Sequence, residues 1–131
     1  MNYIAMYNDA LQCGEITACK RVKAIYARLA AETGKPGAWA FDEGRATRPI
    51  EFIERFCKHS KGEWAGQPVR LALFQKAFIQ ALYGFINTAT GLRRYREAFF
   101  LVSRKNGKST LLAGLALYML IADGEGGAEV Y

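Results

Sequence analysis

Residues 98–110, AFFLVSRKNGKST, give the strongest indication of the fold expected for this 131-residue chain. Residues 98–102 are all apolar, and a short unbroken apolar run predicts a strand buried on both faces, as in a parallel sheet. A polar and basic loop, residues 103–109, follows. Residues 110–121 are then apolar nearly all round, which predicts a helix that is covered on both sides. The order strand, loop, helix indicates an α/β fold.

The loop carries chemistry of its own. The segment VSRKNGKS, residues 102–109, ends in the Gly-Lys-Ser of a phosphate-binding P-loop. Gly107 lets the backbone approach a phosphate, Lys108 places a cation on the β- and γ-phosphates of ATP, and the Ser109 hydroxyl suits Mg²⁺. The following helix points its positive end at the same phosphates. The predicted nucleotide-binding residues of the loop are Val102, Ser103, Arg104, Lys105, Asn106, Gly107, Lys108, Ser109 and Thr110.

One departure from the pattern leaves an alternative open. Val102 stands where a P-loop usually has its first glycine, and Gly-Lys-Ser alone is frequent by chance. The alternative is a basic surface loop between two core elements. The buried type of strand before the loop and the buried type of helix after it favour the phosphate-binding interpretation.

The rest of the chain is expected to be helical. Apolar residues at helical spacing predict helices over 2–12, from an N-cap at Thr17 to Ala31, from Pro49 onwards, and over 73–85. Glycine and proline predict loops at 33–38 and 59–68, and residues 128–131 resemble the start of a second strand.

The charges give one predicted helix a basic side. The chain has 18 Lys and Arg against 12 Asp and Glu, a formal net charge of +6, which favours a polyanionic partner. The cations on the polar side of the helix ending at Ala31 are Lys20, Arg21, Lys23 and Arg28. They indicate either a solvated face or a contact with DNA or another partner.

Several classes of protein are not indicated. No apolar run reaches the roughly 18 residues needed to cross a bilayer, and the N-terminus lacks the pattern of a secretion signal. Cys13, Cys19 and Cys57 form no zinc-binding pair and are expected to be ordinary thiols in a reducing compartment. We therefore expect an intracellular protein.

The loop VSRKNGKS, residues 102–109, resembles the variant P-loop of phage terminase large subunits, in which the first glycine is commonly absent. The departure at Val102 is thus a feature of the resemblance. Further segments that resemble this family are YNDA (7–10), CGEI (13–16), ACKRVK (18–23), GEWAGQP (62–68), LFQ (73–75), YGF (83–85), RRYR (93–96) and LY (117–118). The resemblance covers nearly the whole chain.

The resemblance implies a DNA-packaging ATPase and roles for particular residues. ATP hydrolysis with Mg²⁺ would drive double-stranded DNA into a capsid. Gln75 would read the adenine edge, or serve only as a polar helix-start residue. Arg104 would act in cis on the γ-phosphate, and Arg104 and Lys108 would be the catalytic residues. The alternative for Arg104 is a cation that faces phosphate or DNA without a catalytic part. Trp64 is expected to pack rather than stack on the nucleotide.

The resemblance also implies an organisation and partners. Residues 1–68 would be a helical lead-in region and residues 69–131 the start of the ATPase core, lacking the acidic Walker B strand and the C-terminal nuclease of the family. We expect a mainly helical chain with an incomplete parallel sheet, a tendency to self-associate, and little or no activity alone. The implied partners are the small terminase subunit and the portal protein, in an oligomeric motor in the cytoplasm of a bacterial host.

Two other functions stay open at this stage. One is a fragment of another P-loop ATPase, such as a kinase or helicase. The other is a non-catalytic helical module that binds the small terminase subunit or portal. The intact Lys108 and Ser109 argue against a decayed site.

Overall fold

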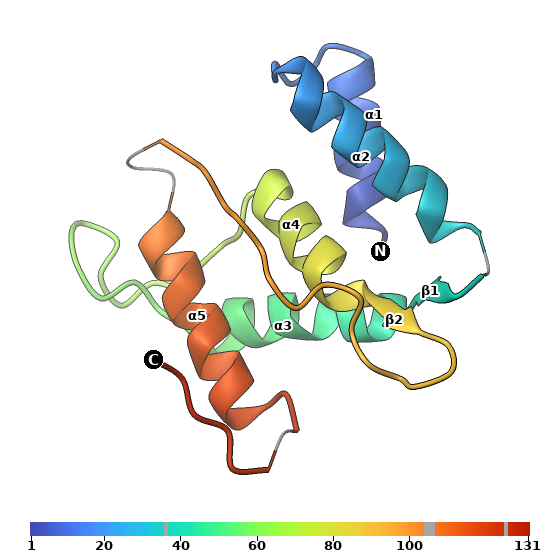
Figure 1. Ribbon diagram of the computed structural model, residues 1–131. Coiled ribbons are helices and arrows are strands. Elements are labelled where there is room, and N and C mark those ends of the chain that lie inside the picture. The colour runs from blue at the N-terminus through green and yellow to red at the C-terminus, as the bar shows by residue number, and fades with distance from the viewer. Residues whose placement is uncertain (36, 104–106, 125) are drawn as a thin grey trace. The chain divides into compact units, whose positions relative to one another are not determined.

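The computed structural model describes residues 1–35, 37–103, 107–124 and 126–131. These residues form helices and two short strands: α1 (Tyr3–Gln12), α2 (Lys20–Thr33), β1 (Trp39–Phe41), α3 (Glu43–Phe56), α4 (Leu73–Gly84), β2 (Phe85–Asn87) and α5 (Lys108–Ile121) (Figure 1). The expectation of a mainly helical chain is confirmed. The chain divides into two compact units: unit 1, Met1–Arg48 with Ala72–Ala98, and unit 2, Pro49–Leu71 with Phe99–Tyr131.

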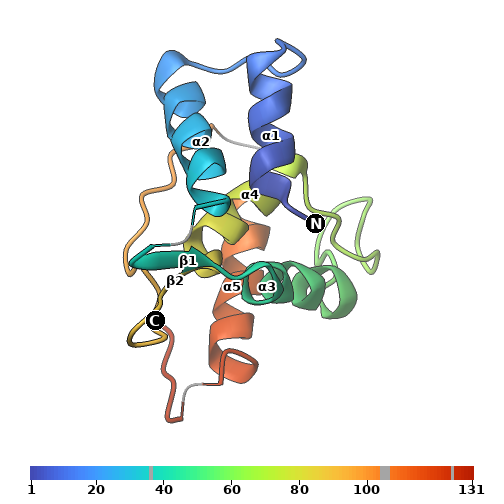
Figure 2. The ribbon, with the colours of Figure 1, turned by 90° about the vertical axis from the view of Figure 1, so that its right-hand side faces the viewer.

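Unit 1 is built on helices α1, α2 and α4. Helices α1 and α2 run antiparallel side by side (Figure 1, Figure 2), and α1 also packs against α4. The Asn2 side chain caps α1 by accepting the Ala5 N–H at 3.0 Å. Two clusters of buried residues form the core, one of Ile4, Leu29 and Phe85 and one of Tyr7, Leu11 and Ala77.

A fully buried glutamine joins three elements of unit 1. Gln80 on α4 accepts the Tyr3 N–H through Oε1 at 2.7 Å, and its Nε2 donates to the Met1 carbonyl at 2.7 Å and to Thr47 Oγ1 at 3.1 Å. A buried amide is costly unless its donors and acceptor are satisfied, and these contacts satisfy them. Gln80 therefore fixes the start of α1 and the first half of α3 to α4.

The sheet of unit 1 has two antiparallel strands. Trp39 lies opposite Asn87, and Phe41 lies opposite Phe85. Gly84, at the end of α4, allows this approach, because a Cβ there would lie 2.4 Å from Phe41 Cε2 and 2.8 Å from Ala46 Cβ. The close approach explains why a glycine ends this helix.

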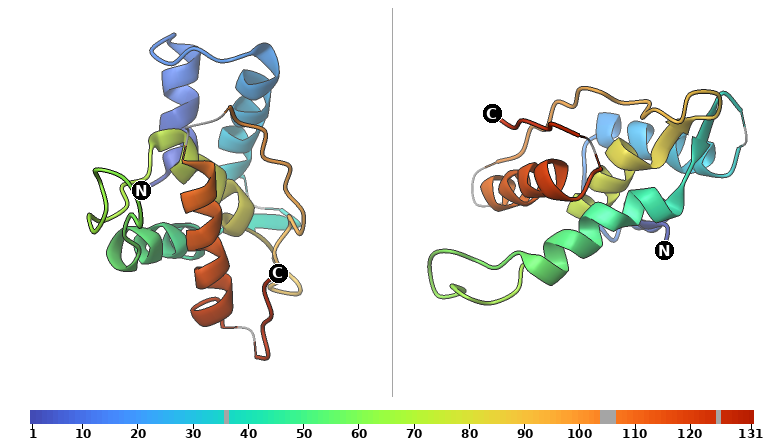
Figure 3. Two further views of the ribbon diagram at one scale, coloured as in Figure 1. Left: turned by 90° about the vertical axis from the view of Figure 1, so that its left-hand side faces the viewer. Right: turned by 90° about the horizontal axis from the view of Figure 1, so that it is seen from below.

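Unit 2 contains the second half of α3 and the whole of α5, whose course is visible in Figure 3. The two helices pack where Gly114 faces Ile53, and a Cβ at Gly114 would lie 2.9 Å from Ile53 Cγ1. The rings of Phe52 and Tyr118 meet edge to face, 5.6 Å apart. The small residue thus brings the two helices close together.

The predicted parallel sheet is not formed. Residues 98–102 and 128–131 are not strands, and Phe99 and Leu101 are 90% and 83% exposed. A strand exists only by hydrogen bonding to a neighbouring strand. In the part of the chain that the structure describes, the sheet is the antiparallel β1–β2 pair of unit 1, and neither segment joins it.

Two helix starts also differ from expectation. Helix α2 has Cys19 rather than Thr17 as its N-cap, because the turn after α1, with Ile16 N–H bonded to the Ala10 carbonyl, occupies the preceding residues. Helix α3 begins at Glu43 and carries Pro49 inside it. The overlooked signal was Asp42, whose Oδ1 accepts the Arg45 N–H at 3.1 Å.

Candidate nucleotide-binding site

One glycine of the predicted phosphate loop, Gly107, has a backbone conformation that favours glycine. Gly107, the N-cap of α5, has φ 72° and ψ 15°, in the left-handed region that other residues rarely adopt. Its carbonyl accepts the Leu111 N–H at 2.9 Å and so closes the first turn of the helix. The local backbone therefore favours the residue type that the phosphate-binding pattern has here.

The start of α5 presents polar groups to solvent. Lys108 and Ser109 are exposed, Thr110 is half-buried, and Leu111 is buried and anchors the first turn in unit 2. The first N–H groups of a helix have no acceptor within it, and they lie at the positive end of the helix dipole. A cation and a hydroxyl beside these groups form an arrangement that suits an anion such as phosphate.

The other residues predicted for the loop are placed only in part. Val102 is half-buried and Ser103 is exposed, and both lie at the start of the loop in unit 2. Arg104, Lys105 and Asn106 lie outside the described residues. Their roles in binding, and that of Arg104 in catalysis, stay predictions.

Gln75 lies in unit 1, near the start of α4. It is only 7% exposed, and its Oε1 accepts the Ala72 N–H at 2.9 Å. This contact is the one expected of a polar residue that satisfies a backbone donor at a helix start. Reading of adenine by Gln75 stays a prediction.

Trp64 does not pack as expected. Its side chain is 58% exposed, in a loop held by its own backbone hydrogen bonds. Gly66 N–H donates to the His59 carbonyl at 2.8 Å, and Gln67 N–H donates to the Trp64 carbonyl at 3.0 Å. The loop itself was predicted from its glycines and proline, and it displays the tryptophan rather than burying it.

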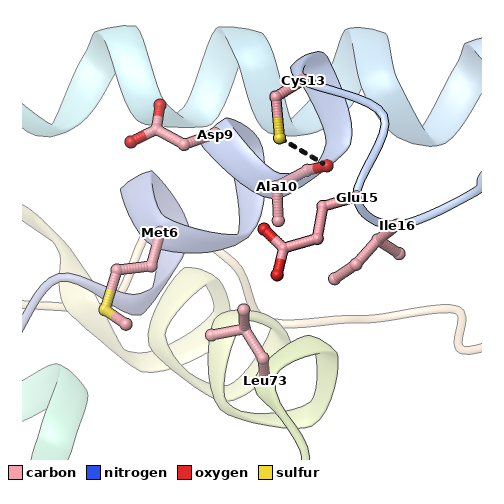
Figure 4. A pocket seen from close by; sticks show the side chains of 7 residues that line it. All are labelled: Met6, Asp9, Ala10, Cys13, Glu15, Ile16 and Leu73. Atoms are coloured by element: carbon pink, nitrogen blue, oxygen red, sulfur yellow. Dashed lines mark hydrogen bonds between the residues drawn. The ribbon is translucent and has the colours of Figure 1, made fainter.

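Unit 1 has an open pocket that sequence reasoning missed. The pocket, of about 460 Å³, is shown in Figure 4 and is lined by Met6, Asp9, Ala10, Cys13, Glu15, Ile16 and Leu73. The Cys13 thiol donates to the Ala10 carbonyl at 3.6 Å. The carboxylates of Asp9 and Glu15 in its lining would repel a phosphate. Of the two sites, the start of α5 is therefore the one suited to a nucleotide.

Neither a metal centre nor a membrane-crossing helix is found in the described part of the chain. Among the residues that the structure describes, no group of three or more His, Cys, Asp or Glu is placed to hold a metal ion. Ser109 thus stays the residue predicted to bind Mg²⁺. None of the described helices combines the length and the apolar character that a membrane crossing requires.

Comparison with known proteins identifies the part of the chain that carries the site. Residues 73–131 match the sequence profile of a family described as "Terminase large subunit, ATPase domain". Over 77 residues the chain is 44% identical to the large terminase subunit of Enterobacteria phage HK97, an alignment that covers 59% of this chain and 14% of that protein. No solved structure matches the chain significantly. The resemblance inferred from the sequence is confirmed over residues 73–131, from α4 to the end of the chain, which match the family of terminase large-subunit ATPase domains.

Proposed function

We propose that the chain is the nucleotide-binding part of a viral DNA-packaging motor, in which hydrolysis of ATP drives double-stranded DNA into a capsid. The observation that carries this proposal is the left-handed Gly107 directly before α5, with Lys108 and Ser109 exposed on its first turn. The match of residues 73–131 to an ATPase-domain family supports it, because that family implies a P-loop fold.

Each residue of the loop has a role in this proposal. Lys108 neutralises the β- and γ-phosphates, and the Ser109 hydroxyl is a hard oxygen ligand of the kind that Mg²⁺ takes. The bound Mg²⁺ supplies charge neutralisation between the phosphates. Arg104 stabilises negative charge on the γ-phosphate during transfer. The backbone of the loop provides N–H donors, and the residues that line the nucleotide are Val102, Ser103, Lys105, Asn106 and Thr110, with Gln75 at the adenine.

The wider organisation follows from the same proposal. Residues 1–68 form a helical lead-in region, and residues 69–131 start the ATPase core. Since the alignment covers 14% of the HK97 protein, the packaging activity and the nuclease belong to the longer protein. Its partners are double-stranded DNA, the small terminase subunit and the portal protein. The active motor is an oligomer in the cytoplasm of the bacterial host.

Calorimetry of Mg-ATP binding tests the proposal. We expect Lys108→Ala to weaken binding about tenfold or more, because a charge-assisted hydrogen bond contributes about 1.5–3 kcal/mol. Lys61→Ala is the control, since it removes an exposed lysine of the same unit away from the loop. Ser109→Ala should reduce the dependence of binding on Mg²⁺.

Two results would contradict the proposed nucleotide site. A folded wild-type chain that does not bind Mg-ATP, or a Lys108→Ala variant that binds as tightly as the wild type, overturns the assignment of the loop. The chain would then act as a helical interaction module rather than through this site.

A further inference from the structure

We propose that the exposed side of α2 binds the phosphate backbone of double-stranded DNA. This side, called the α2 basic face below, consists of Lys20, Arg21, Lys23, Ala24, Ala27, Arg28 and Ala31. It belongs to unit 1, whereas the phosphate loop belongs to unit 2. The inference rests on the proposed function only for the choice of DNA as the polyanion.

The opposite side of α2 fixes which residues face outward. Leu29 is buried at 5% exposure, and Val22 and Tyr26 are half-buried in the packing with α1. The Tyr26 ring meets the Tyr7 ring of α1 edge to face at 4.7 Å. The cations therefore lie on the side that α1 does not cover, and Lys20, Arg21 and Arg28 are exposed.

A neighbouring arginine engages the acidic residue of α2. Arg94 Nη1 lies 2.5 Å from Glu32 Oε2, and its guanidinium stacks near the ring of Trp39 at 5.7 Å. Arg28 Nε reaches the other oxygen of Glu32 only at 3.9 Å. Glu32 is thus held by Arg94, and it leaves the charge of the α2 basic face largely uncompensated.

Among the acidic residues that the structure describes, none is paired with the first turn of the face. Within the described residues, no carboxylate lies within ion-pair distance of Lys20, Arg21 or Lys23. The positive end of the helix dipole lies at the same place. The backbone N–H of Val22, with a smaller contribution from the charge of Arg21, lowers the pKa of the Cys19 thiol. The start of α2 therefore favours negative charge.

The side chains between the cations suit a phosphate backbone better than a protein. A protein interface usually has an apolar and aromatic core. Beside these cations α2 exposes a single large apolar side chain, Ile25 at 47% exposure, and Ala24, Ala27 and Ala31 offer only methyl groups that let the helix approach closely. Lys20 and Arg28 are eight residues apart, or about 12 Å along the helix. One DNA strand carries about three or four phosphates over that length. The number of cations and their span therefore match a DNA backbone.

A gel-shift titration of the full chain with a short DNA duplex tests the inference. The test variant replaces Lys20, Arg21, Lys23 and Arg28 by glutamine, which keeps a good helix former at each position. The control variant replaces four exposed cations elsewhere, Arg48, Arg55, Lys61 and Arg96, by glutamine and has the same net charge. Thermal melting of both variants checks that they fold, and Lys20→Gln/Arg21→Gln serves as a milder second variant.

We expect the test variant to bind DNA at least about tenfold more weakly at low salt, and the control variant to lose much less. The slope of log affinity against log salt should fall by about 2–4 in the test variant, because each phosphate contact contributes about 0.9. Equal losses in both variants, or no DNA binding by the wild type, overturn the inference. A test variant that loses binding to polyglutamate but keeps its binding to DNA also overturns the inference, because this result assigns the face to an acidic protein.

Mg-ATP binding separates this inference from the proposed function. The test variant should bind Mg-ATP as the wild type does, since none of its four substitutions is at a residue assigned to the nucleotide. Loss of DNA binding with intact ATP binding supports the α2 basic face. A wild type that binds DNA through this face but no ATP supports the face and contradicts the nucleotide site.

Discussion

The two units differ in how completely their own residues cover their apolar and polar groups. In unit 1, the buried Gln80 has its donors and acceptor satisfied, and Ile4 and Leu11 are fully buried. In unit 2, α5 buries one side and exposes large apolar side chains on the other, with Leu117 at 45% and Ile121 at 68% exposure. The helix that carries the candidate phosphate site therefore leaves a side with several large apolar residues exposed, and substitutions in the two units should have different effects.

The largest effect is expected from Gly84→Ala in unit 1. The new Cβ would lie 2.4 Å from Phe41 Cε2 and 2.8 Å from Ala46 Cβ, so the free energy of unfolding should fall by about 3 kcal/mol, the upper end for overpacking. Urea unfolding measures it. Gly34→Ala, where a Cβ meets nothing within 4 Å, should change stability by about 0.5 kcal/mol or less. Similar losses in both variants would show that unit 1 is not closely packed at Gly84.

Removal of the buried amide should have the next largest effect. Gln80→Leu leaves the Tyr3 N–H and the Met1 carbonyl without this partner, which costs about 1–3 kcal/mol of unfolding free energy. Gln12→Leu is the control, because that side chain is exposed. If the two variants are equally stable in thermal melts, the network does not hold unit 1 together.

A smaller loss is expected from Gly114→Ala in unit 2. The new Cβ would lie 2.9 Å from Ile53 Cγ1, the stem of a side chain that can shift, so about 1–2 kcal/mol is expected. A double-mutant cycle with Ile53→Ala measures the coupling. Ile53→Ala should cost less beside Ala at position 114 than beside Gly, and additive losses would contradict this contact.

The exposed side of α5 should tolerate charge. Ile121→Lys should change the unfolding free energy by about 0.5 kcal/mol or less and should reduce self-association in analytical ultracentrifugation, because it interrupts an exposed apolar surface. Met6→Lys in unit 1, at a side chain that is 43% exposed, is the matched control and should leave association unchanged. An unchanged sedimentation profile of Ile121→Lys would show that the exposed side of α5 does not mediate self-association.

The smallest effect concerns thiol chemistry at the start of α2. The Val22 N–H lowers the pKa of Cys19, so the thiolate persists at lower pH than in the unfolded chain. In a Cys13→Ser/Cys57→Ser background, the pH midpoint of alkylation should lie lower in the folded than in the unfolded protein. Arg21→Gln should raise the midpoint of the folded protein slightly. A midpoint that does not change on unfolding would contradict the effect.

Local patterns made much of the helical structure predictable. The apolar spacing located α1, α4 and α5 to within about two residues, since each has a side that is buried on its neighbours. The role of Gly107 in close approach to a phosphate stays a prediction, and its left-handed backbone was not predicted from the sequence.

Long-range pairing was not predictable in the same way. Strands β1 and β2 have three residues each, too few for a periodic pattern, and they meet because Gly84 admits Phe41. The apolar run at 98–102 predicted a strand, but an apolar run does not supply the neighbour that a strand needs. At Pro49, a proline expected at a helix start lies inside α3, since the cap at Asp42 starts the helix earlier.

The displayed loop of unit 2 has a practical consequence. The chain has two tryptophans, and each unit holds one: Trp39 lies half-buried under Arg94 in unit 1, and Trp64 stands in solvent in unit 2. Trp39→Phe leaves an emitter in unit 2 alone, and Trp64→Phe leaves one in unit 1 alone. The tryptophan fluorescence of the Trp64→Phe protein therefore reports the unfolding of unit 1 without any added label, whereas the emission of Trp64 should change little when unit 2 unfolds, because its side chain is already 58% exposed.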